Sequence, residues 1–333
     1  GFPEHARALA VRGGSRAAQG DPRGLDDVRR AIEISRGRND SLQLARTLNN
    51  YAIDVYPYEG PAASLAVSEE LLDLAERRGL ARSARAATGT RLDAQLALGR
   101  WDELEVVAKE FLEVPVLSEW ERFWLHISLA EILAHRGEAQ RSVALTDGLV
   151  ESARAFGEGQ ALMASLCVNA LVAAGAGDLA SARRHLLELE DVDGLREQWN
   201  FPLYLPGAVR TALVVSEAGL AQRLVGALRD TTPLHRHGRR AVEAALAEAD
   251  GELDRAASGY SDAAAEWGNF GNVLEQAFAL RGLGRCLLGL GQRAEALEAL
   301  AGARALFSGF EAHPYVREID DLLGDESVVT EAS

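Results

Sequence analysis

The sequence predicts an all-α fold built of about eight helix-turn-helix repeats and closed by a C-terminal capping helix. Three observations support this prediction. Apolar residues follow helical patterns that break at short polar turns containing glycine, and these turns recur at nearly constant spacing. Leucine, alanine and arginine dominate the chain, whereas aromatic residues make up only 6% of it. Extended alternating runs rich in valine, isoleucine and threonine, which are typical of strands, are not found.

The turn glycines define the repeat. They are Gly20, Gly60, Gly99, Gly137, Gly177, Gly219, Gly251 and Gly291, with gaps of 40, 39, 38, 40, 42, 32 and 40 residues. A glycine at the end of a helix accepts the left-handed conformation of a C-cap. The acidic residue that often follows, such as Asp178 or Glu252, suits the positive end of the next helix. We therefore expect each unit to be a helix, a tight turn and a returning helix.

Some units are less regular than others. The helix before Gly20 contains the glycine pair of "RGGSR", and in the third unit Leu92 takes the position where a small residue is expected. In "EQWNFPLYLPG", residues 197–207, two close prolines are expected to interrupt the helical pattern. We place a break between sub-arrays near 197–207 or near 230–233.

The clearest unit lies near the C-terminus and carries a recognisable pattern. From residue 280 the chain reads L-x2-L-G-x2-L and then A-x3-L-x2-A, formed by Leu280, Leu283, Gly284, Leu287, Ala296, Leu300 and Ala303. This pattern resembles the tetratricopeptide repeat (TPR), in which aromatic residues occupy some of these positions and a proline ends the unit. Here leucines replace the aromatic residues and Ser308 replaces the proline.

The resemblance implies a right-handed superhelical solenoid. We expect TPR-like repeats over residues 1–310, a capping helix at 311–324 and a disordered tail at 325–333. The chain is also similar to the C-terminal TPR or MalT-like helical regions of actinobacterial signalling ATPases, which are linked to nucleotide cyclases or transcription regulators. The resemblance implies the regulatory or sensor region of a larger signalling protein, with any catalytic activity in domains absent from this chain.

Composition limits the partners and the compartment. A formal charge of −15 argues against direct nucleic acid binding and favours a basic or neutral partner. The two cysteines, Cys167 and Cys286, lie in apolar helical patterns and are expected to be buried thiols in a reducing cytoplasm. No run of 18 apolar residues and no signal peptide is recognised, so we expect a cytoplasmic protein that does not bind membranes.

The sequence predicts no catalytic residue, metal site or cofactor. The glycine clusters at 175–182 and 282–291 follow helical patterns, whereas a phosphate-binding loop needs a preceding strand. His235 and His237 are two residues apart, so they lie on different sides of a helix and do not form a metal site. We interpret them as a basic helix start or as a local anion contact. The carboxylates fall on the polar side of amphipathic patterns, which indicates solvated faces.

Most candidate partner-binding residues lie in three aromatic or amide-rich segments. Asn49, Asn50 and Tyr51 are expected on the first helix of the second unit. In the TPR family such helices line a concave groove, where asparagines hold an extended peptide; hydrogen bonding between helices is the alternative. Trp120 and Trp124 are four residues apart on one helix face, which fits core packing between units or a peptide-stacking patch.

The third segment contains Trp199, Phe201 and Tyr204, whose aromatic side chains are expected to pack between units, plug the groove or contact a partner. Asn169 completes the candidates. The sequence thus predicts a non-enzymatic scaffold that binds a protein or peptide segment, either from another protein or from another domain of its own polypeptide. The alternative is a groove for a small-molecule effector that controls a linked ATPase, cyclase or transcription regulator. A closed polar pocket with perturbed titratable groups would favour an enzyme instead.

Overall fold

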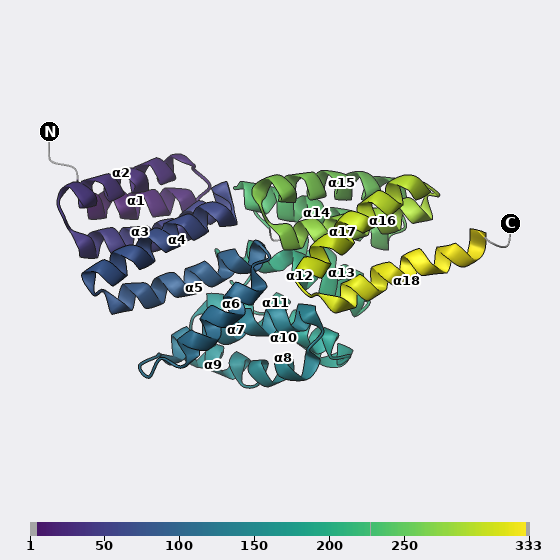
Figure 1. Cartoon of the computed structure of the whole chain (residues 1–333), viewed down its shortest axis with the longest axis horizontal. Helices are drawn as coiled ribbons and strands as arrows, with labels where there is room; N and C mark the ends of the chain where they lie inside the picture. The colour runs from purple at the N-terminus through teal and green to yellow at the C-terminus, as the bar shows by residue number, and fades with distance from the viewer. Residues whose placement is uncertain (1–4, 227, 331–333) are drawn as a thin grey trace.

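A computed structural model of the chain describes residues 5–226 and 228–330, and the structural statements below concern these residues. The described chain is all-helical, with helices α1 to α18 and no strand among those residues (Figure 1). The predicted all-α class is therefore confirmed.

The helices follow one another as pairs joined by tight turns, and in the fourth pair the returning helix is divided into two short helices, α8 and α9. The first four pairs are α1 (Ala6–Ala18) with α2 (Arg23–Gly37), α3 (Ser41–Glu59) with α4 (Pro61–Arg78), α5 (Ala81–Ala97) with α6 (Trp101–Leu112), and α7 (Glu119–Arg136) with α8 (Ala139–Thr146) and α9 (Leu149–Phe156). The next four are α10 (Gly159–Gly175) with α11 (Leu179–Asp191), α12 (Phe201–Val214) with α13 (Ala218–Gly226), α14 (Pro233–Ala249) with α15 (Leu253–Phe270), and α16 (Val273–Gly289) with α17 (Arg293–Gly309). Helix α18 (His313–Thr330) comes last.

Seven of the eight predicted turn glycines have a positive φ and end the first helix of a pair. The exception is Gly219, which lies inside α13. The turn before α13 is made by Ser216, with a φ of 61°, so the spacing from Gly177 is 39 residues instead of 42. The prediction was wrong here because it used glycine alone to mark turns, whereas other residues visit the left-handed region occasionally.

The glycine pair in the first unit does not prevent a helix. Helix α1 runs through Gly13 and Gly14, and a Cβ on Gly13 would lie 2.6 Å from the carbonyl oxygen of Gly24 in α2. The two helices therefore approach each other more closely than a side chain would permit, which explains why glycine is accommodated despite its low helix propensity.

The proline-containing segment at 197–207 is only partly irregular. Residues 192–200 form turns and bends, but α12 begins at Phe201 and includes both Pro202 and Pro206. The expected interruption of the helix is therefore wrong from residue 201 onward. Pro202 lies in the first turn, where its missing N–H would have had no helical partner, and Pro206 removes one internal hydrogen bond without ending the helix.

Helix contacts continue across both positions at which the sequence suggests a break. Helix α12 contacts α10 before it and α14 after it, so the packing continues past 197–207 and 230–233.

Helix α18 covers most of the predicted capping segment at 311–324 and extends through 325–330, where the sequence predicts a disordered tail. Residues 331–333 of that tail lie outside the described residues.

The two ends of the array pack against each other. In Figure 1 the chain runs from α1–α5 through α6–α11 below and returns to α14–α18 on the other side. Helices α3 and α14, α5 and α16, and α7 and α18 are in contact, although they are far apart in the sequence. Four turn glycines lie at this junction, too close to the opposite segment for a Cβ: Gly20 faces Thr231, Gly60 faces Phe270, Gly99 faces Phe310 and Gly137 faces Pro314.

Two further observations bear on the sequence predictions. Cys167 and Cys286 are free, buried thiols, as expected, and burial raises the pKa of both. Within the described ranges, no helix is both long enough and apolar enough to cross a membrane.

Candidate binding groove and inner cavities

A row of four cavities lies inside the array, lined mainly by the first helices of the pairs. The largest, here called the entrance groove, has a volume of about 740 Å³. It shares Ile53, Pro57 and Trp199 with a small acidic pocket of about 20 Å³. That pocket shares Leu203 with a middle pocket of about 30 Å³. The middle pocket in turn shares Arg210 with an arginine cavity of about 560 Å³, so the row follows the interior of the array.

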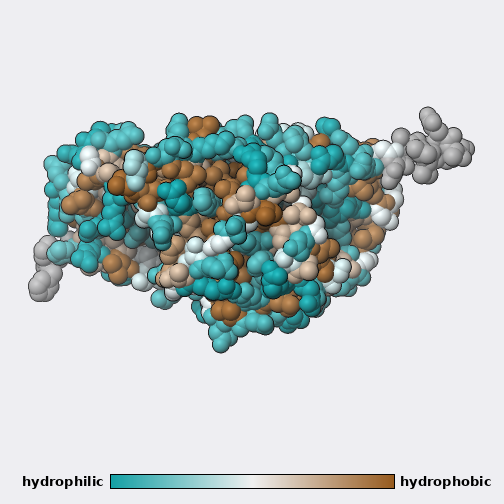
Figure 2. Space-filling model, turned by 90° about the horizontal axis from the view of Figure 1, so that it is seen from below, coloured by the Kyte–Doolittle hydropathy of each residue, from teal (hydrophilic) through white to brown (hydrophobic). Residues whose placement is uncertain are grey.

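The entrance groove lies between the first two helix pairs and the middle of the chain. One wall is formed by α1 and α3, and the other by residues 196–202, Gln160 and the segment that leads into α14. Val11 is 64% exposed and Trp199 48% exposed, so two of the exposed apolar side chains of the described residues line this groove. In the view from below, Figure 2 shows apolar side chains gathered over the N-terminal half.

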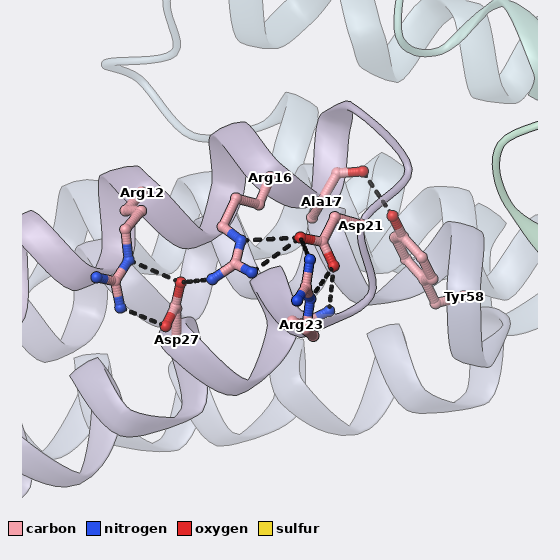
Figure 3. Close-up of polar contacts among 7 residues, drawn as sticks. All are labelled: Arg12, Arg16, Ala17, Asp21, Arg23, Asp27 and Tyr58. Carbon is pink, nitrogen blue, oxygen red and sulfur yellow. Dashed lines mark hydrogen bonds and ion pairs between the residues drawn. The ribbon is translucent and has the colours of Figure 1, made fainter.

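The α1 wall is held in place by ion pairs and one hydrogen bond (Figure 3). Asp27 of α2 contacts Arg12 and Arg16 of α1 at 2.6 and 3.0 Å, and these guanidinium groups lower the pKa of its carboxyl. The hydroxyl of Tyr58 in α3 donates to the carbonyl oxygen of Ala17 at 2.6 Å. Ala17 and Tyr58 both line the entrance groove, so this hydrogen bond joins its two wall helices, α1 and α3, whereas the Asp27 ion pairs join α1 to α2 behind the wall.

Two of the predicted partner-binding residues meet at this groove. Asn50 is exposed on α3, so its amide faces solvent at the groove wall. Trp199 lines the same groove, and its Nε1 donates a hydrogen bond to Oε1 of Gln160 at 2.7 Å. The indole is thereby held in one orientation while half of its surface stays open.

The other amide and tyrosine candidates do not line the groove. Tyr51 is buried in the core, and its hydroxyl accepts a hydrogen bond from Nε of Arg29 at 2.8 Å. Asn169 donates from Nδ2 to the carbonyl oxygen of Ser165 one turn earlier in α10. Asn49 has a buried Oδ1 with no hydrogen-bond partner among the described residues. The hydrogen bonds of Tyr51 and Asn169 lie between and within helices, which matches the alternative of helix packing, whereas the unpaired Oδ1 of Asn49 supports neither alternative.

The remaining aromatic candidates pack inside the array. Trp120 and Trp124 meet edge to face at 5.6 Å between ring centroids, and both contact Phe123. Phe201 is completely buried, whereas Tyr204 is half-buried and lines the middle pocket. Burial raises the pKa of the Tyr204 hydroxyl. Of the predicted site residues, the structure thus brings Asn50 and Trp199 together and assigns the others to packing or to the interior.

Three carboxyl groups in these cavities were missed by the sequence reading. Asp54 lines the entrance groove, Asp93 the acidic pocket and Glu131 the middle pocket. Burial raises their pKa values to about 6, about 7 and about 8, respectively, and nearby Asp93 adds to the shift of Glu131. In the described part of the chain, none of the three carboxyls has a hydrogen bond or an ion pair.

The arginine cavity, in contrast, is balanced in charge. Arg210 forms a bidentate pair with Glu275 at 2.6 and 2.7 Å, and Arg281 contacts Glu318 at 2.9 Å. Arg285 is bonded to Glu248 at 2.8 and 2.9 Å. The spacing of Arg281 and Arg285, four residues apart on α16, was a signal that both lie on one helix face.

His135 and Cys167 supply the remaining reactive groups of the interior. Burial lowers the pKa of His135 to about 3, and its Nδ1 lies 2.9 Å from the Tyr315 hydroxyl. Cys167 lines the middle pocket, but burial raises the pKa of its thiol, so it stays protonated and is a poor nucleophile. Within the described residues, no group of three or more His, Cys, Asp or Glu is arranged to hold a metal ion.

Comparison of the chain with models of known protein families finds no match, and comparison with curated proteins finds none either. What the site can do is therefore argued from its geometry. The interior offers one open groove with exposed apolar and amide groups, a narrow passage with unpaired carboxyls, and a cavity in which each arginine meets a glutamate.

Proposed function

We propose that this chain is a non-enzymatic binding module, a right-handed TPR-like solenoid, and that it holds a segment of a protein partner in the entrance groove. The observation that carries the proposal is the half-exposed indole of Trp199, fixed by Gln160 on a groove that Asn50 also lines. An indole supplies a large contact area with little loss of side-chain entropy, and an exposed amide can bond the main chain of an extended segment.

Charge complementarity selects the kind of segment. The chain carries a formal charge of −15. The groove is lined by Arg196 and Arg229 as well as by Glu197 and Asp54, and Asp54 has no ion-pair partner among the described residues. A basic segment would be attracted by the overall field and by this carboxyl. In keeping with the resemblance, we propose that the segment belongs to a larger cytoplasmic signalling system, either as a separate protein or as another domain of the same polypeptide.

A selection from a random peptide library displayed on phage tests this proposal with the full chain. We expect enriched peptides to be basic and to bind the wild type, to lose most of their affinity for Trp199→Ala, and to weaken with Asn50→Ala. Leu297→Ala is the matched control, because Leu297 is 41% exposed on α17 and does not line the groove. Selected peptides that bind Trp199→Ala as tightly as the wild type would refute the proposed site.

A second candidate, binding of a small effector, is favoured by one feature of the arginine cavity. Its volume of about 560 Å³ falls within the range of small-molecule sites. The Nε of Arg281 is buried there without a hydrogen-bond acceptor in the described residues, so a ligand oxygen could satisfy it. Thermal shift measurements with small mono- and dicarboxylates test this candidate, since stabilisation that Arg281→Met removes is expected only if the cavity binds them.

A further inference from the structure

We propose that the acidic pocket is a specificity pocket for a primary ammonium group on a flexible aliphatic chain, namely a lysine side chain of the bound segment. This inference rests on the proposed function, because the pocket adjoins the entrance groove and shares three lining residues with it. The two cavities share Ile53, Pro57 and Trp199, so a chain lying in the groove passes these apolar side chains before it reaches Asp93.

The size of the acidic pocket fits an ammonium group. Its volume of about 20 Å³ holds roughly one water-sized group. An ammonium group is of this size, whereas the planar guanidinium of arginine is larger and needs a wider slot. A metal ion does not fit the composition of the pocket, because Asp93 is its only carboxyl and no metal-binding cluster is found in the described residues.

The charge of the acidic pocket calls for a cation. Asp93 is partly buried and lines the cavity, and its carboxyl has no partner among the described residues. Elsewhere in this chain, partly buried carboxylates such as Glu248 and Glu275 meet an arginine. Burial without such a partner raises the pKa of Asp93 to about 7, and an ammonium group beside it would lower the pKa again.

The pocket walls suit the rest of a lysine side chain. Ile53 and Pro57 offer apolar surface for the four methylene groups, which long cationic side chains commonly bury. Tyr56 and Trp199 add aromatic rings to the same cavity, and aromatic faces attract an ammonium group.

Other ionisable groups around the passage reinforce this preference. The groups that act on Asp93 and its neighbours are Tyr56 of α3, Glu131 of α7, Tyr204 and Arg210 of α12 and Glu275 of α16. Arg210 is already paired with Glu275. The two carboxyls without a partner, Asp93 and Glu131, therefore leave the passage with excess negative charge once they ionise.

The test uses the full chain and two small probes whose side chains have the same four carbon atoms, Nα-acetyl-lysine methylamide, which keeps its free side-chain ammonium group, and Nα-acetyl-norleucine methylamide. In isothermal titration calorimetry we expect the lysine probe to bind the wild type and the norleucine probe to bind at least about tenfold more weakly, since one charge-assisted contact is lost. Asp93→Asn should remove this discrimination. Asp73→Asn, an exposed carboxyl on α4, should leave it unchanged.

A proton readout separates recognition from a structural effect. Because the ammonium group selects the ionised carboxyl, we expect binding near neutral pH to release protons, seen as a dependence of the heat on the buffer, and to tighten as the pH rises through about 7. The proposed lysine specificity would be refuted if the lysine probe did not bind, if both probes bound equally, or if Asp93→Asn preferred the lysine probe as strongly as the wild type does. If the phage-selected peptides fail to bind Trp199→Ala but the wild type binds the lysine and norleucine probes equally, the lysine pocket is refuted and the proposed peptide-binding function is retained. The two proposals can therefore fail separately.

Discussion

The contact between the two ends of the array predicts different losses of stability when two glycines of nearly equal backbone conformation are replaced by alanine. Gly99 and Gly291 both end the first helix of a pair, with φ of 72° and 73°. Gly99 faces Phe310 across the junction, and an added Cβ would lie 2.8 Å from Cδ1 of that ring and closer still to Cε1. Around Gly291, no atom of the described residues beyond the adjoining chain lies within 4 Å of an added Cβ. Alanine therefore brings the same backbone strain to both sites but a steric conflict to only one.

The expected magnitudes follow from these geometries. Alanine in the left-handed region costs about 1–2 kcal/mol at either site. At Gly99 the overpacking adds about 1–3 kcal/mol, because Phe310 is buried and its ring packs 5.0 Å from that of Trp101, which leaves it little room to move. We expect Gly99→Ala to lower the free energy of unfolding by about 1–3 kcal/mol more than Gly291→Ala does.

Urea unfolding followed by circular dichroism measures both variants. Substitution of Phe310 by leucine in the Gly99→Ala background should recover part of the loss, and the double-mutant cycle gives the coupling between the two positions. Equal destabilisation by Gly99→Ala and Gly291→Ala, or a coupling of zero, would show that the ends of the array do not touch at this point.

Three further predictions concern ionisable groups. Burial raises the pKa of Asp93 from 3.8 to about 7, so between these pH values the folded chain keeps a proton that the unfolded chain has lost. The free energy of unfolding should therefore fall as the pH rises across this interval. Asp93→Asn should raise the melting temperature more at about pH 8 than at about pH 5. Burial lowers the pKa of His135 from 6.5 to about 3, so stability should fall as the pH drops through this interval, and His135→Gln should flatten the acid side of the profile of melting temperature against pH. Loss of the contacts from Asp27 to Arg12 and Arg16 in Asp27→Asn should cost about 1 kcal/mol or less, because these pairs are partly exposed. Amide hydrogen exchange should be faster in α1 and unchanged in α15, and a uniform increase would contradict a local role.

The helix pairs were predictable because their signals are local. Seven turns carry a glycine whose neighbours mark the end of one helix and the start of the next, and each needs only a few residues to specify it. Ser216 escaped the prediction because nothing in its own chemistry requires a positive φ. The contact of Gly99 with Phe310 was not predicted for another reason. This contact depends on small rotations between successive helix pairs that accumulate along the array, and no local sequence pattern encodes their sum.

The unpaired carboxyls were missed because inner helices are covered on more than one side. A surface helix has one apolar stripe, and polar residues outside that stripe are solvated. Helix α5 packs on α3, α4, α6 and α7 and also meets α16 across the junction. Asp93 lies between the buried residues Leu92 and Ala94 and faces the interior passage, a position that the amphipathic reading assigns to solvent.

The two ends of the row of cavities differ in charge balance, and this difference decides what each can accept. In the arginine cavity an anion would have to compete with Glu248, Glu275 or Glu318 for the guanidinium groups. At the other end, a cation that enters past Trp199 displaces no protein cation from Asp93 and relieves the penalty of a buried carboxyl. An incoming charge gains most where the protein has left its counterpart unpaired. This difference between the two ends supports the proposal that a basic segment binds from the groove.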